Sequence, residues 1–377
     1  MKNIHLFLTA VLCAASSCSS PEKGELLEVD LSASAPEKEL VLQDISTVRY
    51  VALDDSVVVP SRPRLVTDTR IVYVDSEGSF LLFGKDGKYL KQFNHKGQGP
   101  GEYPMVRRVL YDAASSWFWV YSGNKLLAYT EDGELRSELA LDESLMNLWE
   151  LVDYDAGHFL GNRMNSTEPY ILISKADGAV ADTLDLSIRK FVEPYIKAED
   201  GGNIFAITPA FYQIVRSGDG YLLTNLGLDT FFVADRQQGL RPCLRRSESV
   251  HGVKEPTFLN AWVEAGGYYF YSTVEKRFAP ETQEGFPQEY YLMEKNTGKI
   301  YKQHVVNEDI EGQDIRLDPA VIERTLHADE GVLVLQADEL LEYAEEGAIT
   351  SEALSRIVES LDEDSNPVLM FLSFSGQ

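Results

Sequence analysis

The 377-residue chain has the composition of a folded globular protein, with 44% hydrophobic and 25% charged residues. Its formal net charge is −26, because Asp and Glu outnumber Lys and Arg by 60 to 34. An acidic surface repels phosphate groups, so we expect neither nucleic acid nor an anionic lipid surface as a partner. The length fits one large domain or two of ordinary size.

The N-terminus has the features of an export signal. Lys2 precedes an apolar run over residues 4–15, and small residues lie directly before Cys18. The run is too short to span a bilayer as a permanent helix, so we predict a signal peptide over residues 1–17. The small residues before Cys18 resemble a bacterial lipobox, which predicts lipidation of Cys18 and membrane attachment by a lipid anchor only. An ordinary cleaved signal with an incidental cysteine is the alternative.

The segment after the predicted signal is polar and charged. We predict that residues 18–45 form a lipidated tether, with a short extended piece at 26–31, and that residues 46–377 form the domain. Once the signal is removed and Cys18 is acylated, Cys243 has no cysteine with which to form an internal disulfide. We expect Cys243 to be a buried, unreactive strand residue.

A unit of four short strands recurs five times from residue 63 onward. The third and fourth strands of each unit are joined by a turn that contains a glycine, and the spacings of these glycines are 46, 45, 61 and 59 residues. Short strands with hairpin turns at such intervals are typical of radial repetition of a four-stranded sheet. A β-sandwich with strands of similar length is the structural alternative. The turn glycines are Gly87, Gly133, Gly178, Gly239 and Gly298.

The two ends of the chain are expected to build a sixth unit together. Residues 314–328 and 331–335 are predicted as its first two strands, and residues 368–372 as its third. The isolated strand at residues 47–53 then supplies the fourth and leaves no open edge. The predicted fold is an all-β, six-bladed β-propeller whose ring is closed by an N-terminal strand in the last blade.

The sixth unit also contains a predicted helical insertion. Leu354, Ile357 and Leu361 recur at helical spacing, and Ser351 can cap the start of that helix. A second helical stretch is expected at residues 339–344. The insertion therefore separates the second and third strands of the last blade.

Residues 95–103 form a glycine-rich connection between the first two units. Three glycines and a proline within five residues cannot continue a strand or a helix, so the chain turns here. The loop lacks the G-x-G-x-x-G spacing, and no Lys-Ser or Lys-Thr follows, so a phosphate-binding role is not expected. We predict a geometric role in which Glu102 and Tyr103 hold the loop against the neighbouring blade.

Three motifs resemble a known family. They lie at residues 93–103, at residues 48–53 and at residues 366–369. On these motifs the chain resembles the six-bladed β-propeller lipoproteins of Gram-negative gut bacteria, which are distantly similar to NHL-repeat and TolB-like propellers. The resemblance implies this fold, export and anchoring at the outer membrane of the cell envelope. It implies little about activity, because that family is largely described by fold and export.

One face of such a propeller is the expected ligand-binding face, since loops from every blade gather there around the central channel. Several predicted loop residues are amides or cations, which suit hydroxyl-rich or anionic ligands. The alternative is that exposed loops are polar in any protein. The predicted ligand-binding residues are His95, Lys96, Gln98, Glu102, Tyr103, Asn124, Arg163, Asn165, Asn225, Lys276 and Arg277.

Two functions fit these features. The first is a monomeric, non-enzymatic binding or scaffold module for a glycan, a peptide or an envelope protein. The second is a channel-mouth lyase or hydrolase acting on a carbohydrate or other anionic substrate, with a carboxylate or histidine as base and Arg163 or Arg277 as electrostatic clamp. The sequence has no G-x-S-x-G nucleophile motif, which favours binding, although propeller enzymes combine residues from separate blades. We expect no cofactor, and no metal site because the histidines fall on unlike loops and strands.

Overall fold

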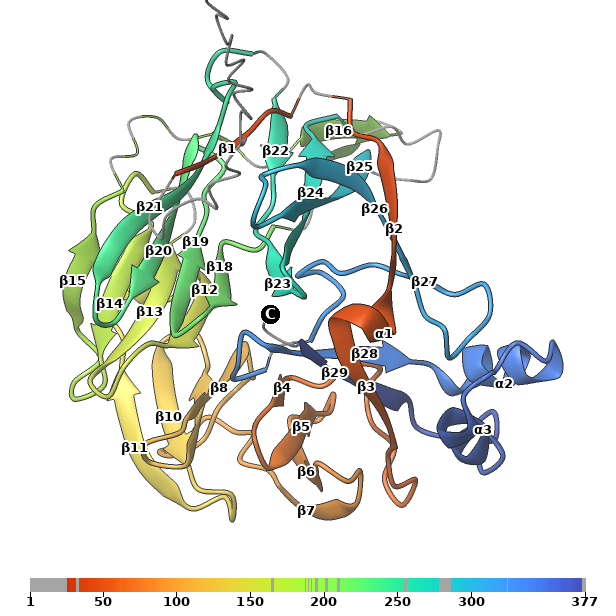
Figure 1. The fold of residues 1–377 in the computed structure, drawn as a ribbon. Coiled ribbons are helices and arrows are strands. Elements are labelled where there is room, and N and C mark those ends of the chain that lie inside the picture. The colour runs from red at the N-terminus through yellow and green to blue at the C-terminus, as the bar shows by residue number, and fades with distance from the viewer. Residues whose placement is uncertain are drawn as a thin grey trace, which may run out of the picture.

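The computed structural model describes residues 26–31, 34–163, 166–186, 188, 190, 192–193, 196–200, 203–208, 211–253, 256–277, 286–323 and 325–374. The chain is a mostly-β propeller in which sheets are arranged around a common axis (Figure 1). Among the described residues, no helix has the length and apolar character needed to cross a membrane. The predicted signal peptide and Cys18 lie outside these residues.

Three regular sheets each contain four antiparallel strands in chain order. Sheet 1 contains β4 (Leu65–Val66), β5 (Arg70–Val74), β6 (Phe80–Gly84) and β7 (Tyr89–Phe93). Sheet 2 contains β8 (Arg108–Asp112), β9 (Trp117–Tyr121), β10 (Lys125–Tyr129) and β11 (Leu135–Ala140). Sheet 3 contains β12 (Leu148–Asp153), β13 (His158–Arg163), β14 (Tyr170–Ser174) and β15 (Val180–Leu184), and a 3-10 helix (Glu143–Leu145) precedes it. The first three predicted units are thus confirmed.

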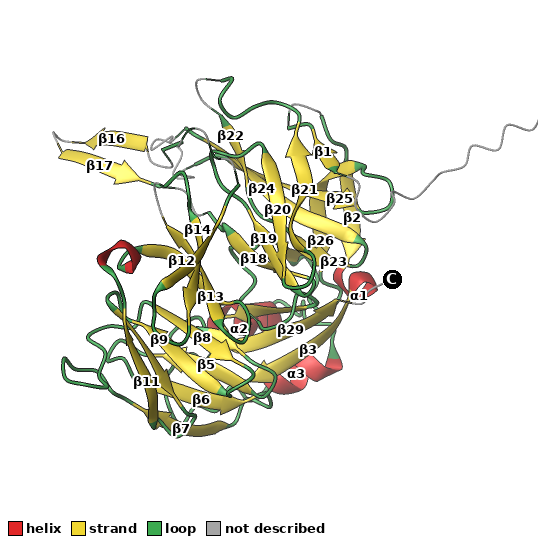
Figure 2. Cartoon of the chain, turned by 90° about the vertical axis from the view of Figure 1, so that its left-hand side faces the viewer, coloured by secondary structure: helices red, strands yellow, loops and turns green. Residues whose placement is uncertain are grey.

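The next two sheets are larger. Sheet 4 contains β18 (Ile214–Ser217), β19 (Gly220–Leu223), β20 (Thr230–Asp235), β21 (Gly239–Arg246) and β1 (Leu27–Val29). Sheet 5 contains β22 (Thr257–Leu259), β23 (Val263–Ala265), β24 (Tyr268–Glu275), β25 (Gln288–Glu294), β26 (Ile300–Val306), β27 (Asp314–Ile315) and β2 (Glu37–Val41). A separate hairpin of β16 (Ile196–Asp200) and β17 (Asn203–Ile207) lies between sheets 3 and 4 in the chain and extends from the body (Figure 2).

Two parts of the predicted tether are strands of the propeller. β1 pairs in parallel with β21, and β2 pairs in parallel with β26, so both lie on the outer edges of their sheets. Lys38 of β2 holds this position, since its Nζ donates to Glu294 at 2.6 Å and to the Tyr268 hydroxyl at 3.0 Å. β1 confirms the extended piece predicted at residues 26–31. The pairing of β1 and β2 with sheets of the propeller was not predicted, because an edge strand needs no apolar pattern of its own.

Sheet 6 brings the two ends of the described chain together. It contains β28 (Glu330–Leu335), β29 (Val368–Phe374) and β3 (Ser46–Ala52), and β3 pairs with β29 from Ala52 opposite Val368 to Ser46 opposite Phe374. This pairing is consistent with a six-bladed propeller closed by an N-terminal strand. The buried side chains of β29 explain its uninterrupted apolar sequence.

The prediction that residues 314–328 form the first strand of sheet 6 was wrong. Asp314 and Ile315 form β27 and pair with β26 of sheet 5, and residues 316–323 and 325–328 contain no strand. One parallel bridge, Val66 to Thr325, connects this segment to sheet 1. Pro319 lacks a donor, and the Asp318 side chain accepts from the Ala320 N–H at 2.7 Å, so the backbone turns here instead of extending.

The helical insertion is present between β28 and β29. It contains α2 (Ala337–Glu345) and α3 (Glu352–Val358), and a short α1 (Leu42–Ile45) precedes β3. The Ser351 side chain accepts from the Leu354 N–H at 3.4 Å, which confirms the predicted cap. Leu340, Leu354 and Val358 are buried in a core that these helices share with sheets 5 and 6.

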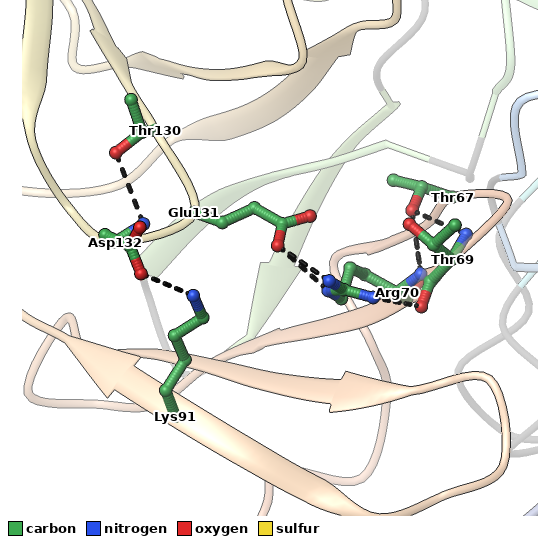
Figure 3. Close-up of polar contacts among 7 residues, drawn as sticks. All are labelled: Thr67, Thr69, Arg70, Lys91, Thr130, Glu131 and Asp132. Atoms are coloured by element: carbon green, nitrogen blue, oxygen red, sulfur yellow. Dashed lines mark hydrogen bonds and ion pairs between the residues drawn. The ribbon is translucent and has the colours of Figure 1, made fainter.

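All five turn glycines have a positive φ, between 67° and 83°. The turn between β10 and β11 shows how such a turn joins two sheets. Its Glu131 and Asp132 form ion pairs with Arg70 at 2.8 Å and Lys91 at 2.5 Å of sheet 1 (Figure 3). The repeated turn therefore contributes to contact between sheets as well as to each hairpin.

The glycine-rich loop joins two sheets as predicted, but of the two predicted residues only Tyr103 holds it against a neighbouring sheet, and Glu102 bonds within the loop. The Glu102 carboxylate accepts from the Gly99 N–H at 2.9 Å, and the fully buried Tyr103 donates its hydroxyl to the Gly78 carbonyl at 2.8 Å. From sheet 2, Glu138 accepts from the Gly101 N–H at 2.7 Å. These contacts fix the connection between sheets 1 and 2.

Candidate functional site in the axial channel

Three hollows share lining residues along the innermost strands and together form one axial site. The middle hollow, here called the bore, has a volume of about 140 Å³ and is lined by β4, β8, β12, β18 and β23 together with residues 319–323 and 325–328. Most of its side chains are apolar, among them Leu65, Val109, Leu151, Ile214 and Ile322. It shares residues with a second hollow at one end and with a third at the other.

The hollow at the start of the inner strands, here called the arginine mouth, has a volume of about 240 Å³. Its lining contains four arginines and, among the described residues, one carboxylate, that of Glu323. The local sequence explains this convergence. Arg62 and Arg64 lie directly before β4, Arg107 lies directly before β8 and Arg108 is its first residue, so two neighbouring sheets begin at the same mouth.

The arginine mouth keeps an excess of positive charge. Arg62 forms an ion pair with Glu323 and donates to the carbonyls of Ala320 and Val321 at 3.0 Å each. Arg107 and Arg108 are held differently, by donation to the Met146 carbonyl at 3.2 Å and the Trp149 carbonyl at 2.8 Å. At Arg107, backbone carbonyls satisfy guanidinium hydrogen bonds without cancelling the charge. Four arginines and, among the described residues, one carboxylate therefore line the mouth of a protein whose net charge is −26.

The hollow at the other end, here called the acidic basin, has a volume of about 860 Å³ and the opposite charge. Several of its carboxylates already have partners. Lys175 pairs with Asp112 at 3.2 Å and with Asp153 at 2.5 Å. Burial raises the pKa of Asp153, and the nearby Lys175 opposes that shift. The acidic lining residues are Asp68, Asp112, Asp153, Asp155, Asp219, Asp235 and Asp329.

One histidine in the same region lies among carboxylates. His327 lies at the acidic basin and contacts Asp68 through Nε2 at 2.6 Å. Over the part of the chain that the structure describes, no group of three or more His, Cys, Asp or Glu side chains is arranged to hold a metal ion.

The predicted ligand-binding residues do not line the axial site, as far as they are described. His95 lies between sheets 1 and 2, where its Nε2 contacts the Gly133 carbonyl at 2.7 Å and its ring stacks on Tyr129. Tyr103 was predicted to contact a ligand, but its side chain has no exposed surface and is part of the core. Glu102 is used within its own loop.

The remaining predicted residues are spread over the surface of the propeller. Asn225 donates to Gln213 at 3.0 Å, Arg163 donates to the Glu168 carbonyl at 3.0 Å, and Arg277 pairs with Glu275 at 3.0 Å. Lys276 is half-buried beside Arg277 and donates its N–H to the Pro256 carbonyl, whereas Lys96, Gln98 and Asn124 are exposed. Asn165 lies outside the described residues. Arg163 and Arg277, the predicted electrostatic clamps, are therefore separate from the axial hollows.

The fold and the channel define a class of protein, a β-propeller with an axial site. Residues 26–373 match the family described as "Domain of unknown function (DUF4934)", and the chain belongs to that family. Among curated proteins, none matches the chain.

Of three solved structures to which the chain is similar, the first supports the fold. The chain is similar to a "Putative exported protein" of Bacteroides fragilis, with 14% identity and a TM-score of 0.61 over 93% of this chain and 100% of that one. It also matches a member of the DUF4221 family from Bacteroides vulgatus, with 13% identity and a TM-score of 0.49 over 88% and 97%. A protein of unknown function from Bacteroides caccae matches with 14% identity and a TM-score of 0.34 over 68% and 86%. At 14% identity, the likeness to the Bacteroides fragilis protein concerns the fold alone.

Proposed function

We propose that this chain is an exported, six-bladed β-propeller that binds an anionic group of a glycan, peptide or protein partner at the arginine mouth. The observation that carries the proposal is the convergence of four arginines on one hollow of an acidic protein. Guanidinium groups bind carboxylates through two parallel hydrogen bonds, and their charge is not lost at any physiological pH. Binding at the mouth is therefore the function that this charge distribution favours.

The alternative of a channel-mouth lyase or hydrolase has one feature in its favour. Glu323 lies beside Arg62 in the mouth, as a general base beside an electrostatic clamp would. However, the Glu323 carboxylate is already engaged by Arg62, so it is not free to take a proton from a substrate. This contact favours binding over catalysis.

Matched pairs of probes test anion binding. Purified protein is titrated with oligogalacturonate and its methyl ester, and with a peptide that has a free C-terminal carboxylate and the same peptide as an amide. We expect the charged member of at least one pair to bind about tenfold or more tightly, since a charge-assisted hydrogen bond contributes about 1.5–3 kcal/mol. Replacing Arg64 and Arg107 together with Gln should remove that preference.

Arg136→Gln is the matched control, because Arg136 is exposed on β11, pairs with Glu134 and lies outside the four-arginine hollow. It should bind like the unchanged protein. Equal binding of charged and neutral probes, or an equal loss in the control, would overturn the proposal.

Export and lipid anchoring are part of the same proposal. They are supported by the signal pattern before Cys18 and by the name of the Bacteroides fragilis relative. Replacing Cys18 with alanine should move the protein from the membrane fraction to the soluble fraction. Retention of the variant in the membrane fraction would contradict the anchor.

A further inference from the structure

The bore continues directly from the arginine mouth. Val109, Tyr212, Pro319, Ile322 and Glu323 line both hollows, so a ligand held by the arginines has the bore directly beside it. At this end the shared lining is mostly apolar. The charged residues Asp153, Arg216 and His327 line the opposite end, where the bore meets the acidic basin. Two further carboxylates line the bore, and each has a cationic partner: Glu264 pairs with Lys295 at 2.9 Å and Glu330 pairs with Lys85 at 3.6 Å.

The size of the bore limits what can enter it. Its volume is about 140 Å³. An apolar cavity of about 150 Å³ stays dry and accepts benzene, so the bore has room for an apolar group of about six carbons. A sugar ring of that size would lose hydrogen bonds to water on entry, and the apolar lining would not replace them.

We infer that the ligand is amphiphilic: a carboxylate held at the arginine mouth is joined to an apolar group of about six carbons that fills the bore. This inference rests on the proposed function and names its ligand class. The orientation follows from charge, because the acidic basin repels a carboxylate and the arginine mouth attracts it. The carboxylate, here called the head, therefore lies at the arginine mouth. The apolar group, here called the tail, points along the axis into the bore.

Two sources offer this chemistry. One is a free alkyl or aryl carboxylic acid, and the other is the C-terminus of a peptide that ends in Leu or Phe, where the carboxylate lies next to an apolar side chain. The mouth and bore make the same contacts with both. Comparing 3-phenylpropionate with acetyl-Gly-Phe distinguishes them, since a peptide receptor should bind the peptide more tightly.

A series of carboxylates of increasing length provides the test. Acetate, butyrate, hexanoate and octanoate are titrated into the purified protein by calorimetry. Each added methylene that enters the bore should raise the affinity about fourfold, and the increase should stop near six carbons, when the bore is full. Hexylammonium serves as the control with the opposite charge and should not bind at the mouth.

Two variants separate the head from the tail. Replacing Arg64 and Arg107 with Gln should weaken every member of the series by a similar factor and leave the gain per methylene unchanged. Leu326→Phe should narrow the bore, so that the increase stops at a shorter chain while acetate binds as before, because Leu326 lines the bore and not the mouth. Leu326 lies in a segment without regular structure, so this change disturbs no strand.

The outcomes are distinguishable. Equal affinities for acetate and hexanoate would overturn the amphiphile and leave the anion site intact. If neither these carboxylates nor the charged probes above bound, the proposed function would also be wrong. Equal binding of hexylammonium and hexanoate would contradict the assignment of the head to the arginines.

Discussion

Replacing Gly87 with alanine tests how the ring is closed. Gly87 lies in the turn between β6 and β7 with a φ of 83°, and its carbonyl accepts from the Asp54 N–H at 2.9 Å. A Cβ at this position would lie 2.0 Å from the Ala52 carbonyl oxygen and 2.9 Å from Cγ1 of Val51. Both neighbours belong to β3, the N-terminal strand that pairs with β29. The alanine therefore cannot be accommodated unless β3 moves away from sheet 1.

The cost has two parts, and Gly298 separates them. A left-handed alanine costs about 1–2 kcal/mol at either position, because Gly298 also has a positive φ, of 67°. No described atom lies within 4 Å of a Cβ built at Gly298, so Gly298→Ala should lower the free energy of unfolding by the backbone cost alone. Gly87→Ala should lower it by a further ~1–3 kcal/mol because of overpacking against β3.

Thermal unfolding measures the difference. At roughly 2 °C per kcal/mol for a chain of this size, Gly298→Ala should lower the Tm by about 2–4 °C and Gly87→Ala by about 4–10 °C. If the two variants melted together, the contact between the turn and β3 would contribute nothing to stability. The interpretation of β3 as the strand that closes the ring would then lose its energetic support.

Three further predictions concern single side chains. Asn366→Ala should lower the free energy of unfolding by about 2–4 kcal/mol in urea titrations, because its amide makes three hydrogen bonds to backbone groups of residues 54–59; a loss below 1 kcal/mol would contradict this. Burial, the largest effect, raises the pKa of Glu264, but Lys295 and two hydrogen bonds outweigh it, so the pKa is lowered overall. The ionised Glu264 carboxylate therefore stabilises the folded protein at neutral pH, and this contribution is lost as the pH falls through the lowered pKa. Glu264→Gln should therefore lower the Tm at pH 7, by an amount that shrinks below about pH 4; a constant difference would refute the assignment. Burial raises the pKa of Cys243 to about 12, so iodoacetamide at pH 8 should label it only after unfolding, and rapid labelling of the native protein would show that the thiol is exposed.

The repeating part of the fold was predictable because its signals are local. The turn glycines have the expected positive φ, and the helical insertion has the expected cap at Ser351. β2 and the pairing of β1 were not predicted, because both strands pair in parallel with strands far along the chain and no hairpin turn marks them. The inner strand predicted for sheet 6 is absent from the described residues because Asp318 and Pro319 favour a turn at this point of the chain.

The residues predicted for ligand binding are not those that line the axial site. Polar loop residues such as Asn124 and Arg277 fit the pattern, yet the residues that face the axis lie at the starts of the inner strands. Two local signals were available: Arg62 and Arg64 flank a proline just before β4, and Arg107 and Arg108 are adjacent at the start of β8. Their convergence depends on the angle between sheets 1 and 2, which a single sequence does not specify.

The two halves of the ring are held together in different ways, and this accounts for the N-terminal strands. At Gly87, Gly133 and Gly178 a Cβ would lie 2.0, 2.8 and 2.9 Å from atoms of the preceding sheet, so these turns pack tightly against their neighbours. No described atom lies within 4 Å at Gly239 or Gly298, where the spacing between units is longer. The N-terminal segment is added in that looser half: β1 lies on sheet 4, β2 on sheet 5 and β3 in sheet 6 (Figure 1). β1, β2 and β3 thus each add an outer strand to one of three consecutive sheets, and in two of these, sheets 4 and 5, the turn glycine makes no close contact with a described neighbour.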